Sequence, residues 1–360
     1  MQPMKLLEIQ AETILIPLKQ PFTTALRSVD RIENVCVRIT TDTEHTGFGG
    51  AAPTAVISGE TVPSILGALK HIHDSLSGMN IEDAEIIFQK LNACMIGNHS
   101  AKAAVDMAVH DLLGKQYGLP LFRLLGGTAG PLETDMTVSM DSPEKMASDS
   151  LEKVGQGFGI LKIKVGKDPA LDISRIMAVR KAIGPGIKLR IDANQGWKPK
   201  EAVVVINRLS KEHVDIELIE QPVSAKDYAG MRFVRDRVDI PVIADESVFS
   251  AADVLRLIEM QAADGINIKL MKCGGIFNAL KIAAIAESAG LTCMVGSMME
   301  SSLSVTAAAH LACSRSVIGA YDLDAPLFCS INPVRGGIHY RASTITIPDG
   351  HGLGISSILS

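Results

Sequence analysis

The chain has 360 residues, of which 47% are hydrophobic and 21% charged, and its formal net charge is −5 at pH 7. This composition excludes a disordered or fibrous chain, and the lack of a basic run argues against a nucleic-acid partner. Residues 1–17 hold no apolar stretch long enough for a signal peptide or a membrane span, so we expect a cytoplasmic protein with no membrane partner. The 6 cysteines show neither C-x-x-C nor zinc spacing, and we expect buried free thiols.

The first third of the chain predicts strands followed by helices. β-branched residues dominate two segments, and a glycine-rich run that does not match G-x-G-x-x-G predicts a turn rather than a nucleotide-binding loop. Apolar residues at helical spacing then predict three helices. These elements are strands at Lys5–Pro17 and Asn34–Thr41, a turn at Gly47–Gly50, and helices at Thr61–Ser77, Ile81–Met95 and Ser100–Tyr117. Together they indicate a small α+β domain.

From about Thr134 onward, short apolar strands alternate with amphipathic helices, which is the pattern of parallel βα units. The strands recur at nearly even spacing, and a series of eight favours a (β/α)-barrel. They lie at Thr134–Ser139, Leu161–Val165, Lys188–Ala193, Ile216–Gln221, Pro241–Asp245, Gly265–Leu270, Thr292–Gly296 and Ile318–Asp322.

Charged residues stand at or near the ends of five of these strands, each about one βα unit from the next. They are Lys164, Asp192, Glu220, Asp245 and Lys269. Barrel enzymes place their chemistry at the carboxyl ends of the strands. We therefore expect these side chains to lie side by side around one mouth of the barrel.

The three carboxylates Asp192, Glu220 and Asp245 predict a metal site. Buried together, they would repel one another unless a cation compensated their charge. Oxygen ligands with an incomplete shell suit Mg²⁺, which keeps positions open for water or substrate. The alternative is that individual carboxylates pair with arginine or cap a helix, but three at this spacing favour the metal.

Lysines on opposite sides of the predicted barrel suggest acid and base groups. Lys162 and Lys164 share one face of a strand, and Lys269 lies four strands away. Burial, the like charge of the neighbouring lysine and a nearby metal would lower a lysine pKa toward the range in which it can act as a base. The alternative is that these lysines are solvated surface residues. One lysine would remove an α-proton to give an enediolate held by the cation, and the other would return a proton to the opposite face.

These motifs resemble those of the dipeptide epimerases in the muconate-lactonizing subgroup of the enolase superfamily, and the resemblance covers essentially the whole chain. It implies an α+β capping domain at residues 1–125, a modified TIM barrel of (β/α)7β type at 126–330, and a segment at 331–360 that returns to the capping domain. It also implies Lys164 and Lys269 as acid/base residues, Lys162 as their neighbour, one Mg²⁺ on Asp192, Glu220 and Asp245, and a homo-oligomer.

The resemblance also suggests a substrate. Asp322 and Asp324 share a face of the last strand, and two carboxylates at the mouth would bind a cation such as the α-ammonium of a dipeptide, unless they only stabilise a loop. Arg27 can pair with a glutamate side chain, although a surface arginine is the alternative. Further pocket residues implied by resemblance are Ile57, Ser139, Met298 and Glu300. The expected reaction is epimerisation of Ala-Glu in the recycling of cell-wall peptides.

Several alternatives stay open. The chain could act on hydrophobic or cationic dipeptides, or be an N-succinylamino acid racemase or o-succinylbenzoate synthase, although neither of these needs an ammonium site. From a different class, it could be a non-catalytic metal-binding barrel. One departure from the family is Gly50, where a glutamate often stands.

Overall fold

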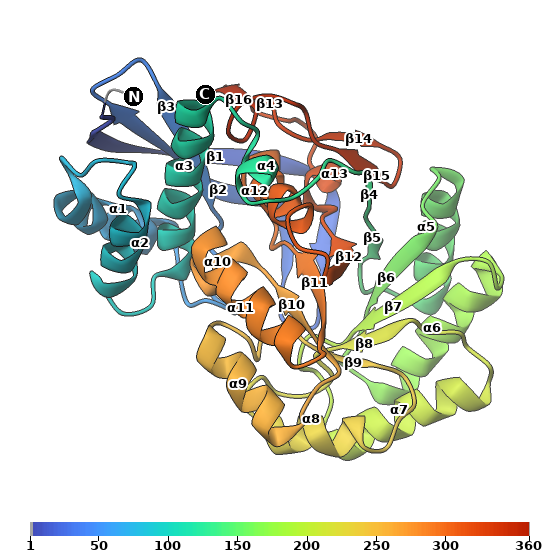
Figure 1. The fold of residues 1–360 in the computed structure, drawn as a ribbon. Helices are drawn as coiled ribbons and strands as arrows, with labels where there is room; N and C mark the ends of the chain where they lie inside the picture. Colours follow the sequence, from blue (N-terminus) through green and yellow to red (C-terminus); the bar gives the residue numbers. More distant parts are fainter. Residues whose placement is uncertain (1–2, 360) are drawn as a thin grey trace.

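The structure is a computed structural model that describes residues 3–359. Its N-terminal part is an antiparallel sheet in the order β1-β2-β3 with helices packed against one face (Figure 1). Alternate residues of β2, such as Val35, Val37 and Ile39, are buried against these helices. The elements are β1 (Leu6–Thr23), β2 (Ser28–Thr41), β3 (Thr46–Ala51), α1 (Val62–Leu76), α2 (Ala84–Ala93), α3 (His99–Tyr117) and α4 (Leu121–Leu124).

The glycine-rich run at Gly47–Gly50 is not a turn as predicted, because it lies inside strand β3. A Cβ atom on Gly49 would stand 1.9 Å from the carbonyl oxygen of Ala104, and one on Gly47 would stand 2.3 Å from that of Ala108. These glycines therefore let β3 approach the backbone of α3, which is a second reason for glycine besides turns. Gly50 faces Leu303.

The expected barrel is present. Eight parallel strands form one sheet in the order β12-β11-β10-β9-β8-β7-β6-β5, and helices between them cover its outside (Figure 1). Every predicted barrel strand is found, although most are shorter than predicted. The elements are β4 (Leu132–Glu133), β5 (Met136–Val138), α5 (Pro143–Gly155), β6 (Ile160–Lys164), α6 (Pro169–Ile183), β7 (Lys188–Asp192), α7 (Pro199–Lys211), β8 (Leu218–Glu220), α8 (Tyr228–Arg235), β9 (Val242–Ala244), α9 (Ala251–Met260), β10 (Gly265–Ile268), α10 (Leu270–Cys273), α11 (Ile276–Ser288), β11 (Thr292–Gly296), α12 (Ser302–Ala312), β12 (Ile318–Asp322) and α13 (Ala325–Phe328).

The first and last barrel strands meet at a narrow seam. There, Thr134 and Tyr321 form a single parallel bridge, and the Thr134 hydroxyl accepts a hydrogen bond of 2.9 Å from the Leu323 amide. Because the seam joins the segment before β5 to the end of β12, it fixes the position of Asp322, the last residue of β12.

The C-terminal residues run back over the N-terminal part of the chain. The Leu353 amide donates a hydrogen bond of 2.8 Å to Asp111 in α3, and Gly352 forms a bridge with Pro120. The remaining strands are β13 (Val334–Gly336), β14 (His339–Arg341), β15 (Thr344–Thr346) and β16 (Ile355–Ile358).

Helix α3 also joins the two parts of the molecule. Its Asp106 carboxylate accepts hydrogen bonds of 2.6 and 3.2 Å from the backbone amides of Ile276 and Phe277, at the start of barrel helix α11. Such a carboxylate accepts hydrogen bonds from the free amides at the start of the helix, and its negative charge interacts favourably with the positive end of the helix dipole. The N-terminal part of the chain is thus tied to the barrel near β10, the strand that Lys269 follows.

All six cysteines are free, but the expectation that they are buried is correct for only four of them. Cys94 and Cys313 are partly exposed, because each lies at the C-terminal end of a helix rather than in its packed face. Within residues 3–359, no helix is both long and apolar enough to cross a membrane.

Candidate active site

The strand register brings the predicted site residues to one level of the barrel. Lys164 on β6 is paired with Asp192 on β7, which is paired in turn with Glu220 on β8. Lys162 lies two residues before Lys164 and on the same face of β6, and Lys269 follows directly after β10. All five side chains are buried, and the prediction that both β6 lysines point into the barrel is confirmed.

Asp192, Glu220 and Asp245 form a group that could hold a metal ion, since one carboxylate oxygen from each lies within 4.8 Å of the others. None of these three residues is exposed to solvent. Nearby, the buried Oδ1 of Asn194 has no hydrogen-bond partner. An oxygen-only donor set with three carboxylates fits a hard divalent cation such as Mg²⁺. The residues present therefore suit the expected metal.

The charges in this group are strongly coupled. Burial acts to raise the pKa of Asp192, but the ammonium groups of Lys164 and Lys162 lower it to about 2. Burial and then the charge of Asp192 raise the pKa of Glu220 to about 7. Repulsion is thus concentrated on Glu220, in the middle of the group, where a cation shared by the three carboxylates would relieve it.

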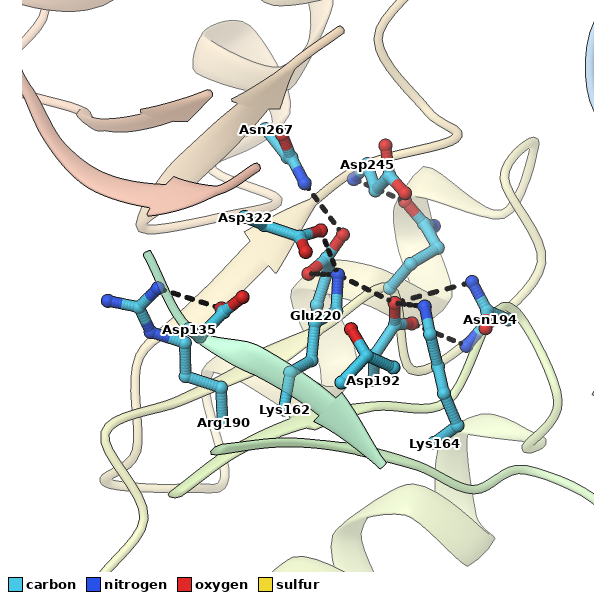
Figure 2. A network of polar contacts seen from close by, with 12 residues as sticks. Asp135, Lys162, Lys164, Arg190, Asp192, Asn194, Glu220, Asp245, Asn267 and Asp322 are labelled. Atoms are coloured by element: carbon cyan, nitrogen blue, oxygen red, sulfur yellow. Dashed lines mark hydrogen bonds and ion pairs between the residues drawn. The ribbon is translucent and has the colours of Figure 1, made fainter. Parts of the chain in front are cut away.

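Lysine ammonium groups surround the carboxylates (Figure 2). The Lys162 Nζ lies 2.7 Å from Glu220, 3.1 Å from Asp192 and 2.7 Å from Asp322. The Lys164 Nζ lies 2.6 Å from Asp192. On the other side, the Lys269 Nζ lies 2.7 Å from Asp245.

Without a bound cation, the pKa of Lys162 and that of Lys269 are raised, not lowered as expected. Burial does lower the pKa of Lys162, but Asp322, Glu220 and Asp192 together raise it well above its ordinary value. For Lys269, burial again acts downward, and Asp245 outweighs it, so the pKa is raised. The sequence argument counted the like charges and the burial but not how closely the carboxylates approach. A cation bound to those carboxylates would offset part of this effect.

Asp322 and Asp324 lie together as expected, though not for the expected reason. Strand β12 ends at Asp322, and Asp324 is the N-cap residue of α13, so the two do not share a strand face. They belong to a second group of carboxylates with Asp135, whose oxygens lie within 4.8 Å of one another. Burial and then Asp322 raise the pKa of Asp324 to about 6. The negative potential of these three carboxylates would favour binding of a positively charged group.

A pocket opens between the turn that joins β1 to β2 and the mouth of the barrel. Among the residues that line it are seven of those predicted from the sequence, namely Arg27, Ile57, Lys164, Lys269, Met298, Asp322 and Asp324. Of the predicted substrate-binding residues, Ser139 and Glu300 do not line it. The Ser139 hydroxyl accepts a hydrogen bond of 3.4 Å from the Thr23 amide, and Glu300 accepts one of 2.7 Å from the Met298 amide, so both support pocket segments from behind.

Several residues of the site were not predicted. Lys272 donates a hydrogen bond of 2.6 Å to Asp245, and Asn267 donates one of 2.8 Å to Glu220. Arg190 and Asp135 form a buried ion pair of 2.9 Å. Arg190 had a usable signal, because a charged residue inside the apolar run Leu189-Arg190-Ile191 shares the face of Asp192. Lys272 had none, since a lysine after a strand is usually a surface residue.

Family models match most of the chain. The enolase C-terminal domain-like model matches residues 145–357, and the mandelate racemase/muconate lactonizing enzyme N-terminal domain model matches residues 8–126. An L-Ala-D/L-Glu epimerase of Clostridium acetobutylicum is 54% identical, over 95% of this chain and 96% of that protein. One of Bacillus subtilis is 49% identical, over 98% of this chain and 97% of that protein.

Solved structures agree with this assignment. The substrate-liganded complex of the Bacillus subtilis L-Ala-D/L-Glu epimerase matches with a TM-score of 0.98 at 48% identity, over 99% of this chain and 100% of that chain. A dipeptide epimerase of Enterococcus faecalis, complexed with Mg and the dipeptide L-Leu-L-Tyr, matches with a TM-score of 0.95 at 41% identity, over 98% and 100% of the two chains. The chain therefore belongs to the mandelate racemase and muconate lactonizing enzyme group of the enolase superfamily, and it is an isomerase of the racemase and epimerase class.

Proposed function

We propose that this enzyme is a Mg²⁺-dependent dipeptide epimerase that inverts an α-carbon by 1,1-proton transfer between two lysines. The observation that carries the proposal is that Lys164 and Lys269, which come from β6 and the end of β10, line the same pocket. Asp322 and Asp324 line that pocket as well. A base on each side of a bound α-carbon, with an ammonium site nearby, is what epimerisation of a free dipeptide requires.

The proposed steps use this chain's own side chains. One lysine removes the α-proton from its side, and the other delivers a proton from the opposite side, which inverts the centre. Reversal exchanges their roles. A divalent cation on Asp192, Glu220 and Asp245 would supply the positive charge that a deprotonated carbon beside a carboxylate requires. Because Lys164 and Lys269 are also paired with Asp192 and Asp245, the same carboxylates hold both bases in place.

The acidic pair at the pocket favours substrates with a free α-ammonium. Asp322 and Asp324 would disfavour an N-succinyl or other acylated amine, since that group is neutral or negative and would leave the carboxylates unpaired. The same pair argues against an o-succinylbenzoate synthase. A non-catalytic barrel would have no need for lysines on two sides of one pocket.

Arg27 supports glutamate as the second residue of the dipeptide. It lies in the turn between β1 and β2, where the Thr24 hydroxyl accepts hydrogen bonds from the amides of Leu26 and Arg27. Burial lowers the pKa of Arg27, and no carboxylate within residues 3–359 forms an ion pair with it. A partly buried guanidinium that lines the pocket suits a substrate carboxylate. We therefore propose Ala-Glu as substrate, and recycling of cell-wall peptides in the cytoplasm as the setting.

A screen of L,L-dipeptides in D₂O with Mg²⁺, read by mass spectrometry, tests the proposal. We expect Ala-Glu to gain one deuterium in preference to other members. The Arg27→Met variant should lose this preference while keeping exchange of apolar dipeptides, and Arg123→Met, outside the pocket, is the matched control. Labelling of apolar or cationic dipeptides alone would overturn the specificity, and labelling of no dipeptide would overturn the function. The expected homo-oligomer stays a prediction.

A further inference from the structure

Asp135 is a fully buried carboxylate that the proposed mechanism does not use. It precedes β5, and none of its surface is exposed to solvent. Its Oδ2 accepts a hydrogen bond of 2.9 Å from Arg190, and its backbone amide donates one of 3.2 Å to the carbonyl of Tyr321. Asp135 is thus fixed at the seam of the barrel, beside the residue that precedes Asp322.

Arg190 ties this seam together from the inside. Its Nη1 also donates a hydrogen bond of 3.0 Å to the Tyr321 carbonyl, and its Nε donates one of 2.6 Å to Glu217. One planar guanidinium therefore joins β7 to the ends of three other segments. The backbone pairing at the seam is a single bridge between Thr134 and Tyr321, so this cross-link adds to the few contacts that hold Asp322 in register.

The second oxygen of Asp135 has no partner among the described residues. Oδ1 is buried and has no hydrogen-bond partner, and an oxygen of Asp135 lies within 4.8 Å of oxygens of Asp322 and Asp324. Figure 2 shows Asp135 between Arg190 and the side of the site where Asp322 lies. Asp322 and Asp324 line the pocket, whereas Asp135 stands behind them. Arg190 offsets the charge through Oδ2, but the unpartnered Oδ1 still costs free energy unless further positive charge lies nearby.

We propose that Asp135, held by Arg190, is a positioning residue of the ammonium subsite, and that its negative charge sets the preference for substrates with a free α-ammonium over neutral ones. The proposal rests on the dipeptide function proposed above. An ammonium group between Asp322 and Asp324 would be attracted by three carboxylates. It would contact these two, while Asp135 would act from behind them. Asp135 therefore acts through the field it adds and through the seam that it fixes.

The cationic side chains near Asp135 do not fully neutralise the carboxylates around it. Lys162 is shared among Asp192, Glu220 and Asp322, and Arg190 is shared between Asp135 and Glu217. Burial and then Asp322 raise the pKa of Asp135 well above its usual range, and Arg190 acts against them. An ammonium group beside Asp322 and Asp324 would act in the same direction as Arg190 and favour the ionised form of Asp135.

The test compares two substrates of the same shape. L-Ala-L-Glu carries the ammonium, and L-lactyl-L-Glu has a hydroxyl group in its place. Rates of α-proton exchange in D₂O, measured with Mg²⁺ over a range of concentrations, give kcat/KM for each. We expect Asp135→Asn to lower the ratio of the two kcat/KM values about tenfold, through the KM for L-Ala-L-Glu, because one nearby charge is lost. The kcat for L-Ala-L-Glu should change much less.

Two further variants separate charge from structure. Glu217→Gln removes a charge from the outer side of the same guanidinium, and the substrate ratio should stay within about twofold of that of the unmodified enzyme. Asp135→Glu keeps the charge, and the ratio should stay within about threefold.

The outcomes distinguish this inference from the proposed function. If the unmodified enzyme exchanges neither compound, the proposed function fails. If it prefers L-Ala-L-Glu and folded Asp135→Asn prefers it equally, only the role of Asp135 fails. Where Asp135→Asn does not fold, a folded Asp135→Glu enzyme that has lost the preference would overturn the inference.

Discussion

The ammonium group of Lys162 lies 2.7 Å from Oδ2 of Asp322, and this contact connects two groups of buried carboxylates. The same nitrogen lies 2.7 Å from Glu220 in the group proposed to hold the metal, while Asp322 belongs to the group proposed to hold the substrate ammonium. Lys162 thus carries the positive charge common to both. Because Lys162 is fully buried, we expect it to act through its neighbours rather than as a base.

This position predicts an unusual effect of Lys162→Met. Because the lysine competes with a divalent cation for the oxygens of Glu220 and Asp192, its loss should tighten Mn²⁺ binding about tenfold while kcat falls at least about a hundredfold. Titration calorimetry with Mn²⁺ and an exchange assay measure the two effects. The surface variant Lys188→Met is the control. Weaker Mn²⁺ binding by a folded Lys162→Met protein would contradict the proposed competition.

Removal of a proposed metal ligand should weaken metal binding and lower the rate of exchange. Glu220→Gln should weaken Mn²⁺ binding at least about a hundredfold, since even partners of ligands are often worth 10 to 100-fold. Chelation of metal from the unmodified enzyme should stop exchange, and Mg²⁺ should restore it. Asp264→Asn breaks an ion pair of 2.7 Å with Arg235 and serves as the carboxylate control. Undiminished Mn²⁺ binding by Glu220→Gln would exclude this residue as a ligand.

Packing of β3 against α3 predicts a stability effect outside the site. In Gly49→Ala, the new Cβ would meet the Ala104 carbonyl oxygen at 1.9 Å, and the free energy of unfolding should fall by about 3 kcal/mol or more. Gly67→Ala is the matched control, because it lies on α1 with open space around it and should raise stability by about 1 kcal/mol. Thermal unfolding of both variants checks this. Equal melting temperatures would contradict the close approach.

The ammonium subsite should cost stability when no substrate is bound. The pKa of Asp324 rises from 3.8 to about 6 on folding, so the folded state binds more protons than the unfolded state between these values. Stability should therefore fall as pH rises through this window. Asp324→Asn removes the penalty. Its free energy of unfolding should exceed that of the unmodified protein by at most about 3 kcal/mol above pH 6, and the two values should converge near pH 4. A difference independent of pH would contradict this account.

Much of the fold and site could be predicted from the sequence because barrel strands carry a simple pattern. Parallel strands place their carboxyl ends together, and five charged residues end or directly follow such strands. They are Lys164, Asp192, Glu220, Asp245 and Lys269. Side-chain alternation likewise placed Lys162 beside Lys164.

Other features depend on contacts between distant segments and had no local signal. Gly47 and Gly49 were mistaken for a turn because only the approach of α3 reveals why they are small. Asp135 lies close to Asp322 and Asp324 because a bridge joins β12 to the segment before β5. The raised pKa of Lys162 depends on three carboxylates that come from three different strands.

The most direct test of the central claim is stereospecific exchange by the two single-lysine variants. In D₂O with Mg²⁺, each of Lys164→Met and Lys269→Met would be offered both epimers of the preferred dipeptide in separate reactions. The remaining lysine can remove and return a proton only on its own face, so we expect epimerisation to fall at least about a thousandfold in both variants. Each should keep exchange with one epimer, and the two variants should keep opposite epimers. Exchange of the same epimer by both variants, or full epimerisation by either, would contradict a two-lysine mechanism.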